Sequence, residues 1–129
     1  MKKYKCIKIV EAEPQEKDGQ PGYKVKYEEG YISWSPKEAF EKGYVDHDTY
    51  KERLSYEYKE ITLKCAKLKN AIDSGKVKPG QFNLMNIQLL TMDTYRHILL
   101  TRISSDESFS EEEVEEIASF GVQSVKGVI

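Results

Sequence analysis

The chain has 129 residues, of which 39% are hydrophobic and 33% charged, and its formal net charge is −2. This length predicts one domain, or two small modules that share a core. A net charge near zero provides no basic field to attract DNA or RNA, and no apolar run approaches the roughly 20 residues that span a bilayer. Lysines also interrupt the N-terminal segment where a signal peptide needs an apolar stretch. We therefore expect a cytoplasmic protein that binds neither nucleic acid nor membrane.

Residues 1–45 predict a small antiparallel β-module. An opening strand is expected at about residues 4–13, followed by a polar Gly/Pro loop at 15–22. Tyr23, Val25 and Tyr27 alternate with lysines, which is the period of a half-buried strand. After a turn at 28–30, a third strand carries aromatic residues through Trp34.

A short helix is expected at residues 36–42. Ser35 would be its N-cap, Pro36 its first residue and Glu38 the return partner of a capping box. Gly43 would end it, because glycine favours the position after a helix.

Residues 46–105 predict a helical hairpin. Asp46 or Asp48 could cap a first helix that begins near Thr49 and ends at Ser74-Gly75. Its apolar residues recur every three or four positions: Leu54, Tyr58, Ile61, Cys65, Leu68 and Ile72. A short loop leads to a second helix over about 83–103, with one apolar face formed by Met85, Leu89, Met92, Leu99 and Ile103.

Residues 106–129 predict a short helix and a tail. Ser110 and Glu113 form a capping box, Gly121 would end the helix, and residues 122–129 would form a strand or a frayed end. The whole chain is expected to be α+β and to form one compact unit.

No catalytic or metal-binding constellation stands out. The two histidines, His47 and His97, are far apart, and Cys6 and Cys65 lack the spacing of a metal site, so reduced, buried thiols are expected. We expect no catalytic residue, no metal and no cofactor, and hence a protein that is not an enzyme.

The second helix carries the unusual features. Arg96 falls within its apolar stripe and needs a partner. It could pair with a carboxylate of the first helix, extend its charged end to solvent along the apolar surface, or bind an anionic ligand. Phe82 and Asn83 stand at its start, where free N–H groups favour a phosphate and a ring can stack on a base. The alternative role for Phe82 is a hydrophobic staple. Only three arginines occur, Arg53, Arg96 and Arg102, and arginine binds phosphate in a bidentate manner.

The same helix is apolar on a second side, at Ile87, Leu90 and Ile98. One hairpin partner cannot cover both sides. We therefore expect a homo-oligomer, a dimer or larger, assembled through residues 83–103.

Two segments resemble families found in phages. Residues 22–44, GYKVKYEEGYISWSPKEAFEKGY, resemble an N-terminal module of tailed-phage proteins. The helix from residue 50 and the segment QLLTMDTYRHILLTRI, residues 88–103, are similar to a helical-hairpin family of crAss-like and other phages.

The combined plan resembles the first-described class of phage Thoeris anti-defence proteins. That resemblance implies a non-enzymatic sponge in the cytoplasm of an infected bacterium, which captures glycocyclic ADP-ribose, and for some members cyclic oligonucleotides, between protomers. It implies that Phe82 stacks on adenine and that Arg96 and Arg102 hold phosphates. Asn83, Gln88 and Tyr95 would contact riboses. The alternative is a structural or interaction protein whose hairpin oligomerises or docks on a host protein.

Overall fold

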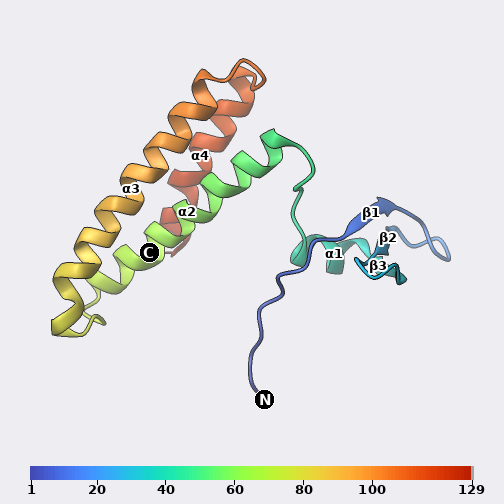
Figure 1. Cartoon of the computed structure of the whole chain (residues 1–129), viewed down its shortest axis with the longest axis horizontal. Coiled ribbons are helices and arrows are strands. Elements are labelled where there is room, and N and C mark those ends of the chain that lie inside the picture. The colour runs from blue at the N-terminus through green and yellow to red at the C-terminus, as the bar shows by residue number, and fades with distance from the viewer. Residues whose placement is uncertain (129) are drawn as a thin grey trace. The chain divides into compact units, whose positions relative to one another are not determined.

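The computed structural model describes the backbone of residues 1–128 and the side chains of residues 1–120. The chain divides into two compact units, Met1–Val45 and Asp46–Ile129. The first combines strands with one short helix and the second is helical (Figure 1), which confirms the predicted α+β class. That the whole chain forms one compact unit stays a prediction.

The first unit is a three-stranded antiparallel meander with a helix after it. Its elements are β1 (Glu11–Pro14), β2 (Gly22–Lys26), β3 (Ile32–Pro36) and α1 (Lys37–Gly43). The strands lie in the order β1-β2-β3, as the alternating pattern predicts. Val25 is its most deeply buried hydrophobic side chain among the described residues.

Gly22 is required by the packing of Trp34. A Cβ at Gly22 would lie 2.4 Å from both the Ser35 carbonyl oxygen and the Trp34 ring. The indole Nε1 of Trp34 donates to the Gln15 carbonyl at 2.9 Å. The tryptophan therefore fastens the loop between β1 and β2 to β3.

The opening strand is shorter than predicted, because β1 begins at Glu11 and residues 4–10 lie outside any strand. Glu11 pairs with Lys26, the last residue of β2. Beyond it the chain turns, with Tyr27 N–H bonded to the Tyr31 carbonyl at 2.8 Å. No residue of β2 is left to pair with the chain before Glu11.

The predicted start of α1 is also wrong. Ser35 and Pro36 belong to β3, Pro36 is the N-cap position, and no side chain caps the helix. Ser35 pairs with Tyr23 in the sheet, and its hydroxyl donates to the Pro36 carbonyl at 3.3 Å. Because β3 holds Ser35 in the sheet, its side chain is not placed to cap a helix. At the other end, Gly43 is the last helical residue, so the helix ends one residue later than predicted.

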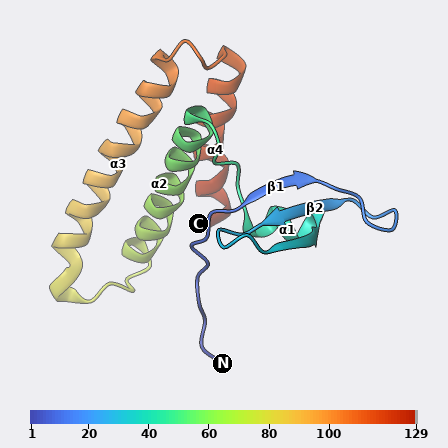
Figure 2. The same ribbon diagram turned by 45° about the vertical axis from the view of Figure 1, so that its right-hand side comes forward.

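The second unit packs two long helices and a third around one core. Its elements are α2 (Tyr50–Asp73), the single 3-10 turn η1 (Pro79–Gln81), α3 (Phe82–Ser105) and α4 (Glu111–Val128). The first two long helices form the predicted hairpin, and α2 lies between α3 and α4 (Figure 2). The buried core consists of Leu54, Tyr58, Leu99, Ile103, Phe109 and Ile117.

Helix α2 is capped by Thr49, and not by Asp46 or Asp48 as predicted. The Glu52 N–H donates to the Thr49 hydroxyl at 3.1 Å, and the Thr49 N–H donates to the Glu52 carboxylate at 2.8 Å. This is a complete capping box. Residues 49–52 carry its Thr-x-x-Glu pattern. This pattern is a stronger capping signal than a lone aspartate, because it gives hydrogen-bond partners to the N–H groups of both the N-cap residue and the third helical residue.

Helix α4 begins with the predicted capping box but runs further than predicted. The Glu113 N–H donates to the Ser110 hydroxyl at 3.1 Å, and the Ser110 N–H donates to Glu113 at 2.9 Å. The helix continues through Gly121 to Val128, so the predicted stop at Gly121 and the strand or frayed tail over 122–128 are wrong. Ile129, the last residue of that tail, lies outside the described residues. A single glycine costs a helix only about 1 kcal/mol.

Among the helices in the described part of the chain, none is both long enough and apolar enough to cross a membrane.

Candidate functional site

The six predicted ligand-binding residues are spread along the whole of α3. Phe82 is its first residue, and Arg102 lies 20 positions later. At 1.5 Å per residue, these two are roughly 30 Å apart along the axis. One ligand of nucleotide size cannot contact both within a single copy, so the predicted set divides into separate groups: Phe82 and Asn83; Gln88 and Tyr95; Arg96; Arg102.

The first group stands at the N-terminal end of α3. Phe82 is 47% exposed, and its carbonyl accepts from the Asn86 side chain at 2.9 Å. No side chain caps this helix start, and its first turn has no acidic residue. The exposed ring leaves stacking on a base sterically open, and the role of Phe82 and Asn83 in a ligand site stays a prediction.

Arg96 is occupied by neighbours in the fold. Its Nε and Nη2 atoms each lie 3.0 Å from Asp93 Oδ1, and Nη1 donates to the Tyr58 hydroxyl at 3.2 Å. Burial alone would lower the pKa of Arg96, but the hydrogen bond and charge of Asp93, with Tyr58, outweigh it and the pKa is raised. The expected carboxylate from the first helix is replaced by an aspartate one turn earlier in α3, while α2 supplies a hydroxyl.

Arg102 lies in different surroundings. Its side chain is exposed, and Nη2 donates to the Tyr50 hydroxyl of α2 at 2.9 Å. Among the described residues, no carboxylate forms an ion pair with it. Tyr50 itself is 50% exposed. Arg102 therefore presents a positive charge that the described residues leave open to an anion.

Arg53 lies three positions after Tyr50 on α2, and residues at this spacing are neighbours on a helix surface. Its Nη1 donates to the Asp48 carbonyl at 2.6 Å. Its charge helps to lower the pKa of Glu52, but it forms no ion pair with a carboxylate in the part of the chain that the structure describes. We call Tyr50, Arg53 and Arg102 the arginine–tyrosine cluster. Two of the three arginines of the chain belong to it.

This cluster has the groups that a nucleotide needs. Planar guanidinium groups bind phosphate through two parallel hydrogen bonds, and an exposed tyrosine ring offers a face for stacking. The sequence prediction included Arg102 but missed Tyr50 and Arg53. The scarcity of arginine was an available signal for Arg53, whereas the pairing of Tyr50 with Arg102 depends on how α2 and α3 align.

Tyr95 and Gln88 lie further along the same side of α3. The Tyr95 hydroxyl donates to Glu57, and Gln88 Nε2 contacts the Met92 sulfur at 3.7 Å. Tyr95 borders a hollow of about 200 Å³ whose other lining residues are Glu57, Glu60, Ile61 and Lys64. Two carboxylates against one lysine make this hollow unfavourable for a phosphate on its own.

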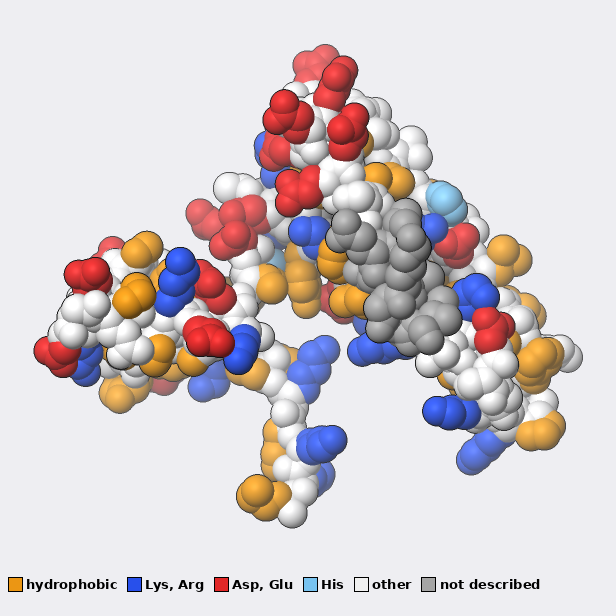
Figure 3. Space-filling view, turned by 180° about the vertical axis from the view of Figure 1, so that it is seen from behind, with side chains coloured by type: hydrophobic (Ala, Val, Ile, Leu, Met, Phe, Trp, Pro, Cys, Tyr) orange, Lys and Arg blue, Asp and Glu red, His pale blue; other side chains and the backbone are white. Residues whose placement is uncertain are grey.

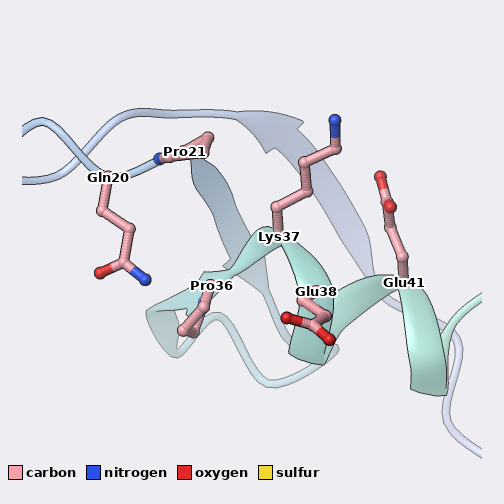
Figure 4. Close-up of a pocket in the computed structure, with 6 residues that line it drawn as sticks. All are labelled: Gln20, Pro21, Pro36, Lys37, Glu38 and Glu41. Carbon is pink, nitrogen blue, oxygen red and sulfur yellow. The ribbon is translucent and has the colours of Figure 1, made fainter.

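A larger hollow of about 420 Å³ lies in the first unit. Figure 4 shows its side chains coming from the loop before β2 and from the junction of β3 with α1; the lining residues are Gln20, Pro21, Pro36, Lys37, Glu38 and Glu41. It also has two carboxylates for one lysine. Glu41 accepts from the Tyr23 hydroxyl at 2.8 Å, so this hollow does not favour an anion either.

The two cysteines lie in different surroundings. Cys65 is buried, and burial raises the pKa of its thiol, which disfavours the reactive thiolate. Cys6 is exposed, and not buried as predicted. Among the residues described, no three His, Cys, Asp or Glu side chains gather in a way that could hold a metal ion.

The chain is similar to one known family over part of its length. Residues 48–105 match the family model described as Sequestin. The matched segment covers α2, η1 and α3 and contains all three members of the arginine–tyrosine cluster. Comparisons with curated proteins and with solved structures give no match. The phage resemblance of residues 22–44 lies outside the matched segment and stays a prediction.

Proposed function

We propose that this chain is a sequestering protein that binds an anionic nucleotide signal at the arginine–tyrosine cluster and holds it without cleaving it. One observation carries the proposal. Arg102 donates to the exposed Tyr50 and has no carboxylate ion pair among the described residues, and Arg53 follows Tyr50 at the i,i+3 spacing on α2. All three lie within the segment that matches a family whose name denotes sequestration.

The cluster favours a ligand with phosphate groups and an aromatic base. Two arginines can neutralise two phosphate charges, and charge-assisted hydrogen bonds are roughly twice as strong as neutral ones. Glu113, one of three glutamates in the first turn of α4, pairs with Lys51 at 2.9 Å. Glycocyclic ADP-ribose, with two phosphates and adenine, is the ligand we propose first, and cyclic oligonucleotides are the second class.

Sequestration needs affinity and does not need a reactive group. A protein that lowers the free concentration of an immune signal must hold it with a dissociation constant below the signalling concentration. The proposed setting is the cytoplasm of an infected bacterial cell, where such a protein would block a nucleotide-activated defence. We propose that the protein is not an enzyme and uses neither a metal nor a cofactor.

Thermal melting with defined ligands tests this proposal. A ligand at 100 times its dissociation constant should stabilise the protein by about 2.7 kcal/mol. We expect this shift with glycocyclic ADP-ribose or a cyclic dinucleotide, but not with adenosine, which lacks phosphate. Arg102→Ala should abolish it. Lys64→Ala, which removes an exposed cation from the same helix as Arg53, should preserve it and serves as the control.

Recovery of the ligand tests the absence of turnover. After incubation, the protein is denatured by heat and the supernatant is chromatographed. Intact ligand supports sequestration, whereas a new product that depends on the protein would show an enzyme.

The alternative is an interaction protein that binds no nucleotide and docks through its hairpin on a host protein. The exposed apolar side of α3 is the observation that favours it. This alternative would be favoured if no nucleotide shifted the melting temperature and if Arg102→Ala behaved like the wild-type protein in all assays.

A further inference from the structure

Helix α3 has an uncharged side that the fold leaves open. Six residues at alternating spacings of three and four form what we call the outer seam: Leu84, Ile87, Thr91, Thr94, Ile98 and Thr101. All six are exposed, in a chain of which one third is charged. Their spacing is that of the contact positions of a coiled coil.

The outer seam lies on the side of α3 that faces away from α2. Figures 1 and 2 both show α3 as an outer helix of its unit, with α2 on one side of it. In Figure 3, hydrophobic side chains gather along the outer edge of this unit, at the right of the view, whereas acidic side chains gather at the top, where α3 passes into α4.

The threonines of the outer seam present methyl groups to solvent. The hydroxyls of Thr91, Thr94 and Thr101 each donate at 2.9 Å to the carbonyl four residues earlier in α3. Their polar atoms are therefore satisfied within the helix. A partner surface that covers these threonines would leave no hydroxyl without a hydrogen bond.

We propose that the outer seam binds the outer seam of a second copy, with the two α3 helices antiparallel. The spacing of the six seam residues is the same whether they are counted from the N-terminal or the C-terminal end of α3, and its midpoint lies between Met92 and Asp93. In that register, Leu84 lies opposite Thr101 of the second copy, Ile87 opposite Ile98, and Thr91 opposite Thr94. A two-fold interface requires such self-complementarity, and the outer seam meets this requirement with a second copy.

The distribution of charge favours the antiparallel direction. The first half of α3, from Phe82 to Met92, contains no charged residue, whereas the second half contains Asp93, Arg96 and Arg102. A parallel pair would place Arg102 opposite Arg102 of the second copy, and like charges that face each other repel. The antiparallel pair places each charged half against an uncharged half.

This antiparallel register would also bring together two of the predicted ligand-binding residues, one from each copy. Gln88 and Tyr95 are seven positions apart and flank the seam on the same side. Within one copy they are separated by roughly 10 Å along the axis, but flanking positions of this kind meet across an antiparallel pair. Tyr95 of one copy would lie beside Gln88 of the second. The two arginine–tyrosine clusters would lie at opposite ends, with their Arg102 residues about 28 Å apart along the axis.

Sedimentation of the full chain tests the interface. We expect a dimer at micromolar concentration and monomers for Ile87→Lys and Ile98→Lys, which place a lysine in the seam. Ile32→Lys changes an equally exposed isoleucine of the first unit and should remain dimeric. A wild-type monomer at this concentration, or a dimer that both seam variants leave intact, would overturn the proposal.

Disulfide cross-linking tests the register, in a background in which the exposed Cys6 is replaced by Ser. Ile87→Cys and Ile98→Cys proteins that carry tags of different size are mixed under reducing conditions and then oxidised. We expect the mixed disulfide to form at least tenfold faster than either self-disulfide. Faster self-linking of Ile87→Cys would indicate parallel helices and refute the antiparallel register. Neither experiment involves a nucleotide, so the outcome is independent of the proposed sequestration.

Discussion

Both sides of α3 carry apolar residues, but the fold of the single chain buries them on one side only. On the side that faces the core, Leu99 and Ile103 are fully buried and Arg96 is paired with Asp93. On the other side, Ile87, Leu90 and Ile98 remain more than half exposed. Folding of the single chain explains the first side only. An apolar stripe in a sequence can therefore serve either the core or an association surface, and only the packing of the neighbouring helices distinguishes them.

We expect the largest difference between the two sides of α3 in the free energy of unfolding that is lost when a leucine is replaced by alanine. Leu99→Ala removes a fully buried side chain and should lower the free energy of unfolding by about 2–5 kcal/mol. Leu90→Ala, at a position 69% exposed, should change it by less than about 0.5 kcal/mol in the monomer. Urea unfolding of each variant in the Ile87→Lys background, which we expect to be monomeric, measures both. Equal losses would show that the outer side is covered within one copy.

The second difference concerns the arginines. Arg96→Ala should cost about 1–3 kcal/mol of folding stability, because it removes charged hydrogen bonds from Asp93 and leaves the buried Tyr58 hydroxyl without this partner. Arg102→Ala should leave the stability of the free protein within about 0.5 kcal/mol while it abolishes the response to nucleotide. Melting curves with and without ligand separate the two. A large loss of stability in Arg102→Ala, with an unchanged ligand response, would assign this residue to the scaffold.

Most of the fold could be predicted where local signals agree with tertiary packing. The apolar stripe of α2 and the stop at Ser74-Gly75 locate that helix to within one residue, and the alternation at Tyr23 and Val25 locates β2. The errors fall where tertiary contacts decide. Pairing in the sheet holds Ser35 away from the start of α1, and the turn after Lys26 ends the strand opposite Glu11.

The candidate site was less predictable, because it depends on alignment between helices. Helical periodicity placed Arg96 in the apolar stripe, where the structure has it, but did not reveal that Asp93 is its partner. Tyr50 is distant in sequence from Arg102, and only the alignment of α2 with α3 brings its hydroxyl to the guanidinium. Composition gave one usable clue, since only three arginines occur and two of them belong to the cluster.

The smallest expected effect is the loss of stability at low pH, which should differ between the start of α3 and the starts of the two neighbouring helices. Hydrogen bonds from Thr49 and Asp48 lower the pKa of Glu52 at the start of α2, and hydrogen bonds from Ser110 and Lys51 lower the pKa of Glu113 at the start of α4. The first turn of α3 has no acidic residue.

A carboxyl whose pKa is lower in the folded state stabilises the fold when it is ionised. Its contribution is complete above the unfolded pKa of 4.5 and is lost as the pH falls through the lower folded value. We therefore expect the melting temperature to decrease below pH 4.5, with the starts of α2 and α4 losing amide-exchange protection before the start of α3. Replacing Glu52 and Glu113 by glutamine retains a capping side chain but removes the charge, so the double variant should show a smaller decrease over this interval. An equal decrease in the double variant would show that other carboxylates govern the acid response.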